Sequence, residues 1–393
     1  MLQQLPTHDP ALRRALLAQF TADPVVQEAL LAYNAPPFAH ARLPERLRLP
    51  LADEPHVADW RAAYLDGSTP ADAFARLRAA LPQWSLPVRA GLSTTDEYRA
   101  VMRCGEPVPA ALAAEAPQLA APGAITLAII PHFAGALPVI TTDDHADFAC
   151  CVRVMAGRSE PVAVPAAVNA MMVAGMLNWD RIRRYRAAWT AAQPHGDWSA
   201  EQARIAREEP WRLFDRFVLL NRAPYSGCSA AALGLILSDD KWLAQSMIIR
   251  CEHEFTHYAT KRLFDTMRNN LLDELIADAA GLLAARGAYE PALARQFLGV
   301  EQAPAIRAGG RLHAYCSDLP EAARPALAAL AAAATDGIAA GVRTLALDAA
   351  ATGQRARFML ALTALTVELL AAPGAAEHIA AAWHALGPRL ATE

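Results

Sequence analysis

The stretch SDDKWLAQSMIIRCEHEFTHYATK, residues 238–261, decides the fold of the region around it. Ser238 is followed by two acidic residues, a pattern typical of the beginning of a helix. A serine side chain caps the first free N–H groups, and acidic side chains favour the positive end of the helix dipole. We therefore predict that a helix opens here and runs to about Phe264.

At 100° per residue this helix has two distinct faces. The apolar face is expected to point into the core and carries Ala244, Met247, Ile248, Cys251, Phe255 and Tyr258. The opposite face carries Ser246, Arg250, His253, His257, Thr260 and Lys261. The two histidines are four residues apart, so their imidazoles rise from one face and can bind a single ion. The alternative is a solvated polar face that happens to hold two histidines.

A second pair of acids favours the metal over the solvated face. The segment ELIAD, residues 274–278, places Glu274 and Asp278 four apart on the next predicted helix, again on one face. A catalytic zinc ion takes three protein ligands and leaves a fourth position to water. His253, His257 and Glu274 meet that count. Asp278 is then expected to accept a hydrogen bond from a ligand histidine and orient its ring.

Glu254 lies between the histidines in the sequence but about a quarter-turn away from them on the helix. That position suits a carboxylate that holds a metal-bound water and acts as a base, in contrast to a direct ligand. The five-residue pattern HEFTH, residues 253–257, therefore predicts both a metal site and a group that activates water.

The sequence resembles the gluzincin metallopeptidases, the thermolysin-like group, whose signature is HExxH followed by ExxxD on a second helix. The resemblance covers HEFTHYAT from His253 and DELIADAAG from Asp273. It implies that His253, His257 and Glu274 are zinc ligands, that Glu254 is the general base, and that Asp278 supports a ligand. It also implies a zincin-like catalytic core in which two helices form the metal site.

The residue that stabilises the oxyanion in those enzymes cannot be assigned here by spacing. Either His313 or Tyr315 is a candidate donor, and the alternative is a loop histidine with a packed tyrosine. Arg268 lies between the two predicted ligand helices and is a further candidate, with an ordinary ion pair as the alternative. The catalytic candidates are therefore Glu254, Tyr315 and Arg268.

The whole chain is predicted to be mainly α-helical with a small β-sheet, an α+β fold. Residues 124–130 and 137–142 are β-branched runs that are expected to form a hairpin across Gly135. Residues 166–189 and 200–220 are predicted as helices. We expect three regions: N-terminal helices in residues 1–120, the zincin-like catalytic region in 121–320, and C-terminal helices in 321–393.

The composition restricts the class of protein. The chain has 393 residues, of which 54% are hydrophobic and 19% charged, with a net charge of −4. No run of Lys and Arg indicates a nucleic-acid surface or an anionic membrane patch. No uninterrupted apolar stretch reaches the roughly 20 residues of a spanning helix. The six cysteines show no finger spacing, and the N-terminus has no basic segment before an apolar one, so a cytoplasmic protein is expected.

The sequence thus predicts an intracellular zinc-dependent hydrolase with Glu254 as base and a small peptide or amide as substrate. Two alternatives stay open. One is a non-catalytic protein in which zinc joins two helices and the helical body binds a partner. The other is a metal-dependent, non-hydrolytic enzyme of a biosynthetic pathway that uses the same ligands.

Overall fold

The computed structural model describes residues 9–268 and 270–392. The protein is 57% helical, with two small sheets in the described part of the chain, so the expected α+β class with a majority of helix is confirmed. The chain forms two compact units. The helical unit contains residues 1–51 and 224–393, and the sheet unit contains residues 52–223.

These units run across the boundaries expected near residues 120 and 320. The strands after residue 120 pack against helices before it, because the sheet needs a covering layer to bury its apolar face. The helices after residue 320 likewise pack on helices before it. The segments that belong together in space are therefore not consecutive in sequence.

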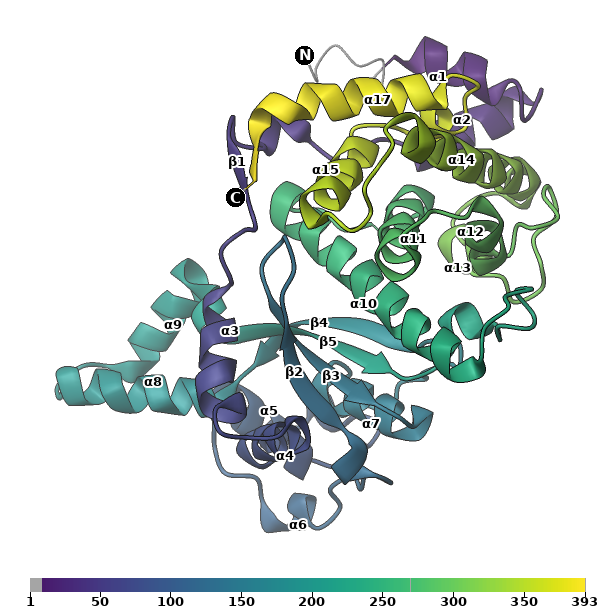
Figure 1. Ribbon diagram of the computed structural model, residues 1–393. Coiled ribbons are helices and arrows are strands. Elements are labelled where there is room, and N and C mark those ends of the chain that lie inside the picture. The colour runs from purple at the N-terminus through teal and green to yellow at the C-terminus, as the bar shows by residue number, and fades with distance from the viewer. Residues whose placement is uncertain (1–8, 269, 393) are drawn as a thin grey trace. The chain divides into compact units, whose positions relative to one another are not determined.

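The sheet unit contains a four-stranded sheet in the order β2-β3-β5-β4. Its strands are β2 (Thr126–Ile130), β3 (Leu137–Thr142), β4 (Ala170–Leu177) and β5 (Phe214–Asn221). β2 and β3 form the expected antiparallel hairpin, with Thr126 opposite Thr141. β3 runs parallel to β5, and β4 runs antiparallel to β5. The helices of the unit are α3 (Pro55–Trp60), α4 (Pro70–Ala80), α5 (Asp96–Cys104), α6 (Ala110–Ala113), α7 (His145–Met155), α8 (Trp179–Ala192) and α9 (Trp198–Glu208) (Figure 1).

The predictions of long helices over residues 166–189 and 200–220 are each wrong in one half, because that half forms a strand. β4 occupies 170–177 before α8 begins, and β5 follows α9 at 214–221. Both strands are short apolar runs, and periodicity alone does not separate a buried strand from a buried helix. Gly175 has φ of +79° beside the register shift between Ala174 and Met176, a backbone that fits a β-bulge and not a helix.

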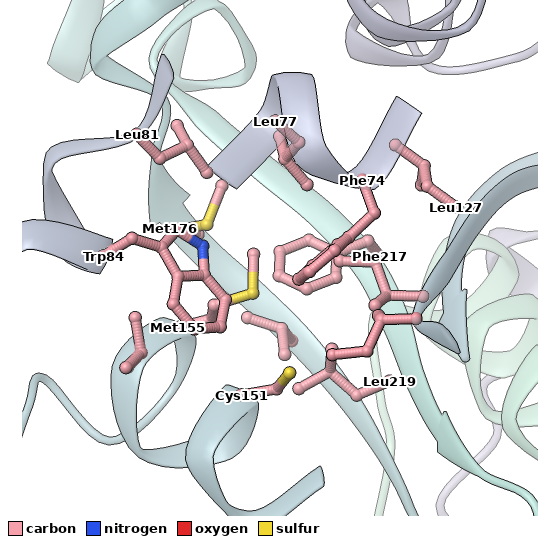
Figure 2. Close-up of a cluster of buried hydrophobic side chains, with 14 of the residues drawn as sticks. Phe74, Leu77, Leu81, Trp84, Leu127, Cys151, Met155, Met176, Phe217 and Leu219 are labelled. Carbon is pink, nitrogen blue, oxygen red and sulfur yellow. The ribbon is translucent and has the colours of Figure 1, made fainter. Parts of the chain in front are cut away.

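The core of the sheet unit lies between the sheet and its helices. Phe74 and Leu77 of α4 meet Phe217 and Leu219 of β5, and Cys151 of α7 closes the cluster from another side (Figure 2). All five side chains are fully or almost fully buried. Their spacing on α4 follows the helical period, and on β5 the two-residue period of a strand, so both elements direct apolar side chains into one core.

The helical unit is built around two long helices, α10 (Asp239–Phe264) and α11 (Leu271–Arg286). Figure 1 shows α10 and α11 side by side, with α10 along the edge of the group of helices in this unit. These are α1 (Pro10–Leu17), α2 (Pro24–Tyr33), α12 (Pro291–Leu298), α13 (Leu312–Tyr315), α14 (Arg324–Thr344), α15 (Thr352–Thr363), α16 (Val367–Leu370) and α17 (Ala375–Leu386). A two-stranded parallel sheet joins β1 (Leu47–Leu49) to β6 (Leu390–Thr392).

Both long helices begin with side-chain caps. Ser238 Oγ accepts a hydrogen bond from the N–H of Lys241, as the sequence predicted. Asn270 Oδ1 accepts one from the N–H of Asp273 at the beginning of α11. α10 ends at Asp265, which has φ of +55°. The caps satisfy free backbone donors at the helix ends and thereby set where α10 and α11 start.

Among the described residues, one helix is long and apolar enough to cross a membrane, the segment Glu321–Thr344 that contains α14. This is a statement of length and composition alone. Within its most apolar window 61% of the residues are buried, and α14 packs against α16 and α17. The core helix of a soluble protein passes the same test, so the observation is weak evidence for a membrane span.

α10 and α11 approach closely at Gly281. A Cβ atom added at this position would lie 2.7 Å from the carbonyl oxygen of Ile249. Backbone atoms cannot move aside as the end of a flexible side chain can, so Gly281→Ala should force the helices apart. We expect a loss of about 1–3 kcal/mol in the free energy of unfolding, measured by chemical denaturation.

The matched control is Gly374→Ala in the same unit. An added Cβ there would meet nothing closer than Glu377 Oε2 at 3.6 Å, which is ordinary van der Waals contact. If Gly281→Ala unfolded at the same denaturant concentration as this control, the close approach of the two helices would be contradicted.

Candidate metal centre

The histidine face of α10 is buried. His253 is 8% exposed and His257 is 5% exposed, and Arg250 on the same face is also buried. α11 packs along this face, so the solvated face that the sequence left open does not exist. Ile248, expected in the core, is instead 45% exposed. Both faces of the helix have protein neighbours, which a two-sided amphipathic pattern does not anticipate.

His253, His257 and Glu274 direct their donor atoms at one point. The Nε2 atoms of His253 and His257 lie 3.2 Å apart. Glu274 Oε2 lies 3.4 Å from Nε2 of His253, and Glu274 Oε1 lies 3.5 Å from Nε2 of His257. One donor atom from each residue fits within a group whose members are all within 4.8 Å. The three side chains selected from the sequence spacing are thus brought together.

These distances fit a tetrahedral metal ion. Zinc–nitrogen and zinc–oxygen bonds are about 2.0–2.2 Å, so two ligand atoms on a tetrahedron lie about 3.4 Å apart. The two imidazole nitrogens lie 3.2 Å apart, and each lies 3.4–3.5 Å from a different oxygen of Glu274, so these separations are close to that edge length. Two imidazoles and a carboxylate also form the donor set of many catalytic zinc sites. The group could therefore hold a metal ion, and zinc suits its chemistry.

Asp278 holds the ring of His253 from behind, as expected. Its Oδ1 lies 3.0 Å from Nδ1 of His253. With Nδ1 carrying the hydrogen and donating it to Asp278, Nε2 is left with a lone pair toward the donor triangle. Tyr225 joins the same group, since its O–H donates to Asp278 Oδ1 at 2.6 Å and lies 2.9 Å from Nδ1 of His253.

The carboxylates of the centre are held in their charged forms. Burial by itself would raise the pKa of Glu274, but His253, His257 and Arg311 outweigh it and hold that pKa well below its usual range. Asp278 follows the same pattern, and its pKa is lowered chiefly by Arg311 and His253 against the effect of burial. A carboxylate must be ionised to bind a metal, so the surroundings of Glu274 prepare it as a ligand.

The pKa of His253 is raised, whereas the pKa values of the two carboxyl groups are lowered. Burial disfavours a charged ring, but the carboxylates of Glu274 and Asp278 outweigh that effect and raise the pKa of His253 to about 9. The same negative potential that attracts a proton to this ring attracts a metal cation. A metal ion bound at Nε2 competes with that proton.

Glu254 is half-buried at the position after His253. Its charge acts on Arg250, one turn earlier: burial brings the pKa of that guanidinium down to about 10, against the opposing effects of Tyr225 and Glu254. No hydrogen bond ties the Glu254 carboxylate within the part of the chain that the structure describes.

The structure places the other catalytic candidates at different distances from the donor triangle. Tyr315 is at the centre: its hydroxyl accepts a hydrogen bond from Arg311 Nε at 3.0 Å, and burial raises its pKa. Arg268 is exposed, and its backbone N–H, not its guanidinium, bonds Asp273 Oδ2 at 2.6 Å. His313 is also exposed. Of these three, the structure brings only Tyr315 to the donor triangle.

Sequence reasoning missed the roles of Tyr225 and Arg311. Both lie outside the two long helices, in segments whose position relative to the motif no local spacing encodes. Arg311 stands two residues before His313 and four before Tyr315, so the sequence analysis selected its segment without naming Arg311 itself.

A cavity of about 390 Å³ lies elsewhere, in the sheet unit. Its walls are Phe74, Ala75, Arg78, Ala79, Trp84, Ser85 and Pro122. None of the residues of the donor triangle lines it.

Comparisons with curated proteins and with solved structures find no match to the chain. A zincin core is consequently not confirmed, although the metal-binding geometry stands on its own. One family model matches residues 15–374, which is most of the chain. The chain belongs to that family, DUF7005, which is described as a family of unknown function.

Proposed function

We propose that this protein is a zinc-dependent hydrolase that cleaves an amide bond in a small substrate. The observation that carries the proposal is the buried triangle of His253, His257 and Glu274, whose donor atoms lie within 4.8 Å of one another, with the two imidazole nitrogens 3.2 Å apart and each 3.4–3.5 Å from one of the two Glu274 oxygens. Glu254 beside that triangle supplies the base that hydrolysis needs, and a resemblance to gluzincin peptidases supports the same roles.

A zinc ion held by the triangle would polarise a carbonyl and lower the pKa of water. Glu254 acts first as the general base and then as the general acid. Its carboxylate takes a proton from the attacking water while oxygen bonds to the carbonyl carbon. It then returns the proton to the leaving nitrogen as the carbon–nitrogen bond breaks. Because no hydrogen bond holds the Glu254 carboxylate in the described structure, it is free to make both transfers.

The burial of the centre supports small substrates. The three triangle residues are 8%, 5% and 3% exposed. A folded protein cannot bring a backbone amide to atoms this enclosed, which favours a short peptide or an acylated amine as the substrate. Enclosure also excludes water and strengthens the electrostatic interactions of the site. A cytoplasmic location and the absence of nucleic-acid and membrane partners stay predictions from the sequence.

The same burial supports a second candidate, a non-catalytic protein in which zinc joins α10 to α11. Two ligands come from the first helix and one from the second, so a bound ion would cross-link them. Glu254 argues against this candidate, because a purely structural site does not use a base. A metal-dependent reaction other than hydrolysis at the same ligands is the remaining alternative.

Zinc binding is the first expectation to measure. The purified protein should hold close to one zinc per chain by elemental analysis, because the triangle offers three donors to one ion. His257→Ala removes one of them and should lose most of the bound zinc while the protein keeps its fold by circular dichroism. A folded wild-type protein that takes up no zinc on titration would refute the proposal.

Glu254→Gln should separate catalysis from metal binding. It keeps the shape of the side chain and removes the base, so zinc content should stay unchanged while turnover falls by about 10²–10⁴-fold. The assay uses a library of short peptides and acylated amines, with casein as the test for general proteolysis. We expect activity on a few small amides and none on casein.

Glu252→Gln is the matched control, since it removes a carboxylate from the same helix turn outside the proposed machinery. Equal loss of activity in both variants would show that Glu254 has no special role. Wild-type protein that binds zinc but cleaves none of the amides would favour the non-catalytic candidate. Rapid cleavage of casein would instead indicate an ordinary endopeptidase.

A further inference from the structure

The two acids of α11 pose an electrostatic problem. Glu274 and Asp278 lie four apart on one helix and are only 3% and 1% exposed. Like charges at this spacing repel each other, and a buried charge without a partner costs several kcal/mol. A cation is therefore needed beside them before any metal ion binds.

Arg311 is that cation. Its Nη2 donates to Glu274 Oε2 at 2.8 Å. Its Nη1 lies 3.2 Å from each oxygen of Asp278. One planar guanidinium thus joins the carboxylate of a candidate ligand to the carboxylate that orients His253. A rigid fork of donors can hold two carboxylates in a fixed relation, which a lysine ammonium cannot do.

The remaining donors of Arg311 are also used. Nε donates to Tyr315 Oη at 3.0 Å, and Nη1 is within reach of Tyr225 Oη at 3.1 Å and Ser226 Oγ at 3.3 Å. The guanidinium carbon lies 5.3 Å from the ring centre of Tyr225 and 5.7 Å from that of Tyr315. Every nitrogen has an acceptor, so Arg311 is not a free anchor for the carboxylate of a substrate.

The segment that carries Arg311 is itself fastened to α11. Tyr33 of α2 donates its O–H to the carbonyl oxygen of Tyr315 at 2.9 Å. The same hydroxyl accepts a hydrogen bond from the N–H of Leu271, the first residue of α11, at 2.9 Å. One side chain therefore ties α13, directly after Arg311, to the beginning of the helix that carries Glu274.

We propose that Arg311 is a positioning residue of the metal centre, which holds Glu274 and Asp278 in the arrangement that a metal ion requires. This inference rests on the proposed metal site. Arg311 neutralises one of the two buried negative charges and fixes one oxygen of Glu274. The donor triangle is then already assembled in the metal-free protein, and binding does not have to bring two repelling carboxylates together.

The test compares Arg311→Met with Arg311→Lys. The methionine side chain is of similar length but has neither the positive charge nor the hydrogen-bond donors of Arg311. Lysine keeps the positive charge but lacks the planar guanidinium. Zinc affinity is measured by competition with a chromophoric chelator, and folding by circular dichroism. We expect Arg311→Met to bind zinc about 10–100-fold more weakly, which is the typical effect of removing a side chain that supports a metal ligand. Arg311→Lys should recover only part of that loss.

The absorption spectrum of the cobalt(II)-substituted protein is the second measurement, because it reports the geometry of the ligands and not the stability of the fold. Loss of the fork should change the spectrum in both variants. Arg307→Met is the matched control: Arg307 pairs with Glu301 at 2.7 Å on the surface. Its affinity for zinc and its cobalt spectrum should equal those of the wild type.

The outcomes separate the two proposals. Wild-type protein that binds no zinc overturns the metal site, and this inference with it. Wild-type protein that binds zinc, with unchanged affinity and an unchanged cobalt spectrum in a folded Arg311 variant, overturns the positioning role alone. If Arg311→Met does not fold, the folded Arg311→Lys protein decides by the same two measurements.

Discussion

The packing of α11 against the polar face of α10 is the constraint on which the candidate centre depends. Helices usually meet through apolar side chains, but here the interface buries His253, His257, Glu274 and Asp278. Each of these groups would lose free energy in the interior without a partner. They are tolerated because they satisfy one another and because Arg311 supplies the balancing charge. Close contact at Gly281 keeps the two helices near enough for these bonds to form.

The local part of this arrangement could be predicted from the sequence. Two histidines four apart on one helix and two acids four apart on the next have fixed geometry as soon as each helix forms. The caps at Ser238 and Asn270 set where the helices begin. Spacing therefore selected His253, His257, Glu274 and Asp278, and the structure brings all four together. The hairpin of β2 and β3 was predictable for the same reason, since its strands are joined by a short turn.

The parts that escaped prediction depend on contacts between distant segments. β4 and β5 are short, mostly apolar runs that form strands because they pair with each other, and β5 pairs in addition with β3. Tyr225 and Arg311 reach the centre from loops, and only the folded chain brings them to Asp278. The burial of the histidine face of α10 has the same cause, since α11 covers it, whereas Ile248 on the face expected in the core is 45% exposed.

A second buried carboxylate shows why Glu274 is suited to a metal and Asp215 is not. Asp215 of β5 accepts hydrogen bonds from Trp60 Nε1 at 2.6 Å and Asn178 Nδ2 at 2.7 Å and pairs with Arg181, a set of partners that fixes it in place. Burial raises its pKa despite these partners. The cations and donors around Glu274 hold its pKa well below the usual range. Glu274 also lies 3.4 and 3.5 Å from the Nε2 atoms of His253 and His257, so its negative charge favours a proton or a metal ion on these nitrogens. A buried acid that stays ionised opposite two imidazole nitrogens has the electrostatics of a metal ligand, whereas Asp215 has those of a residue that holds the fold together.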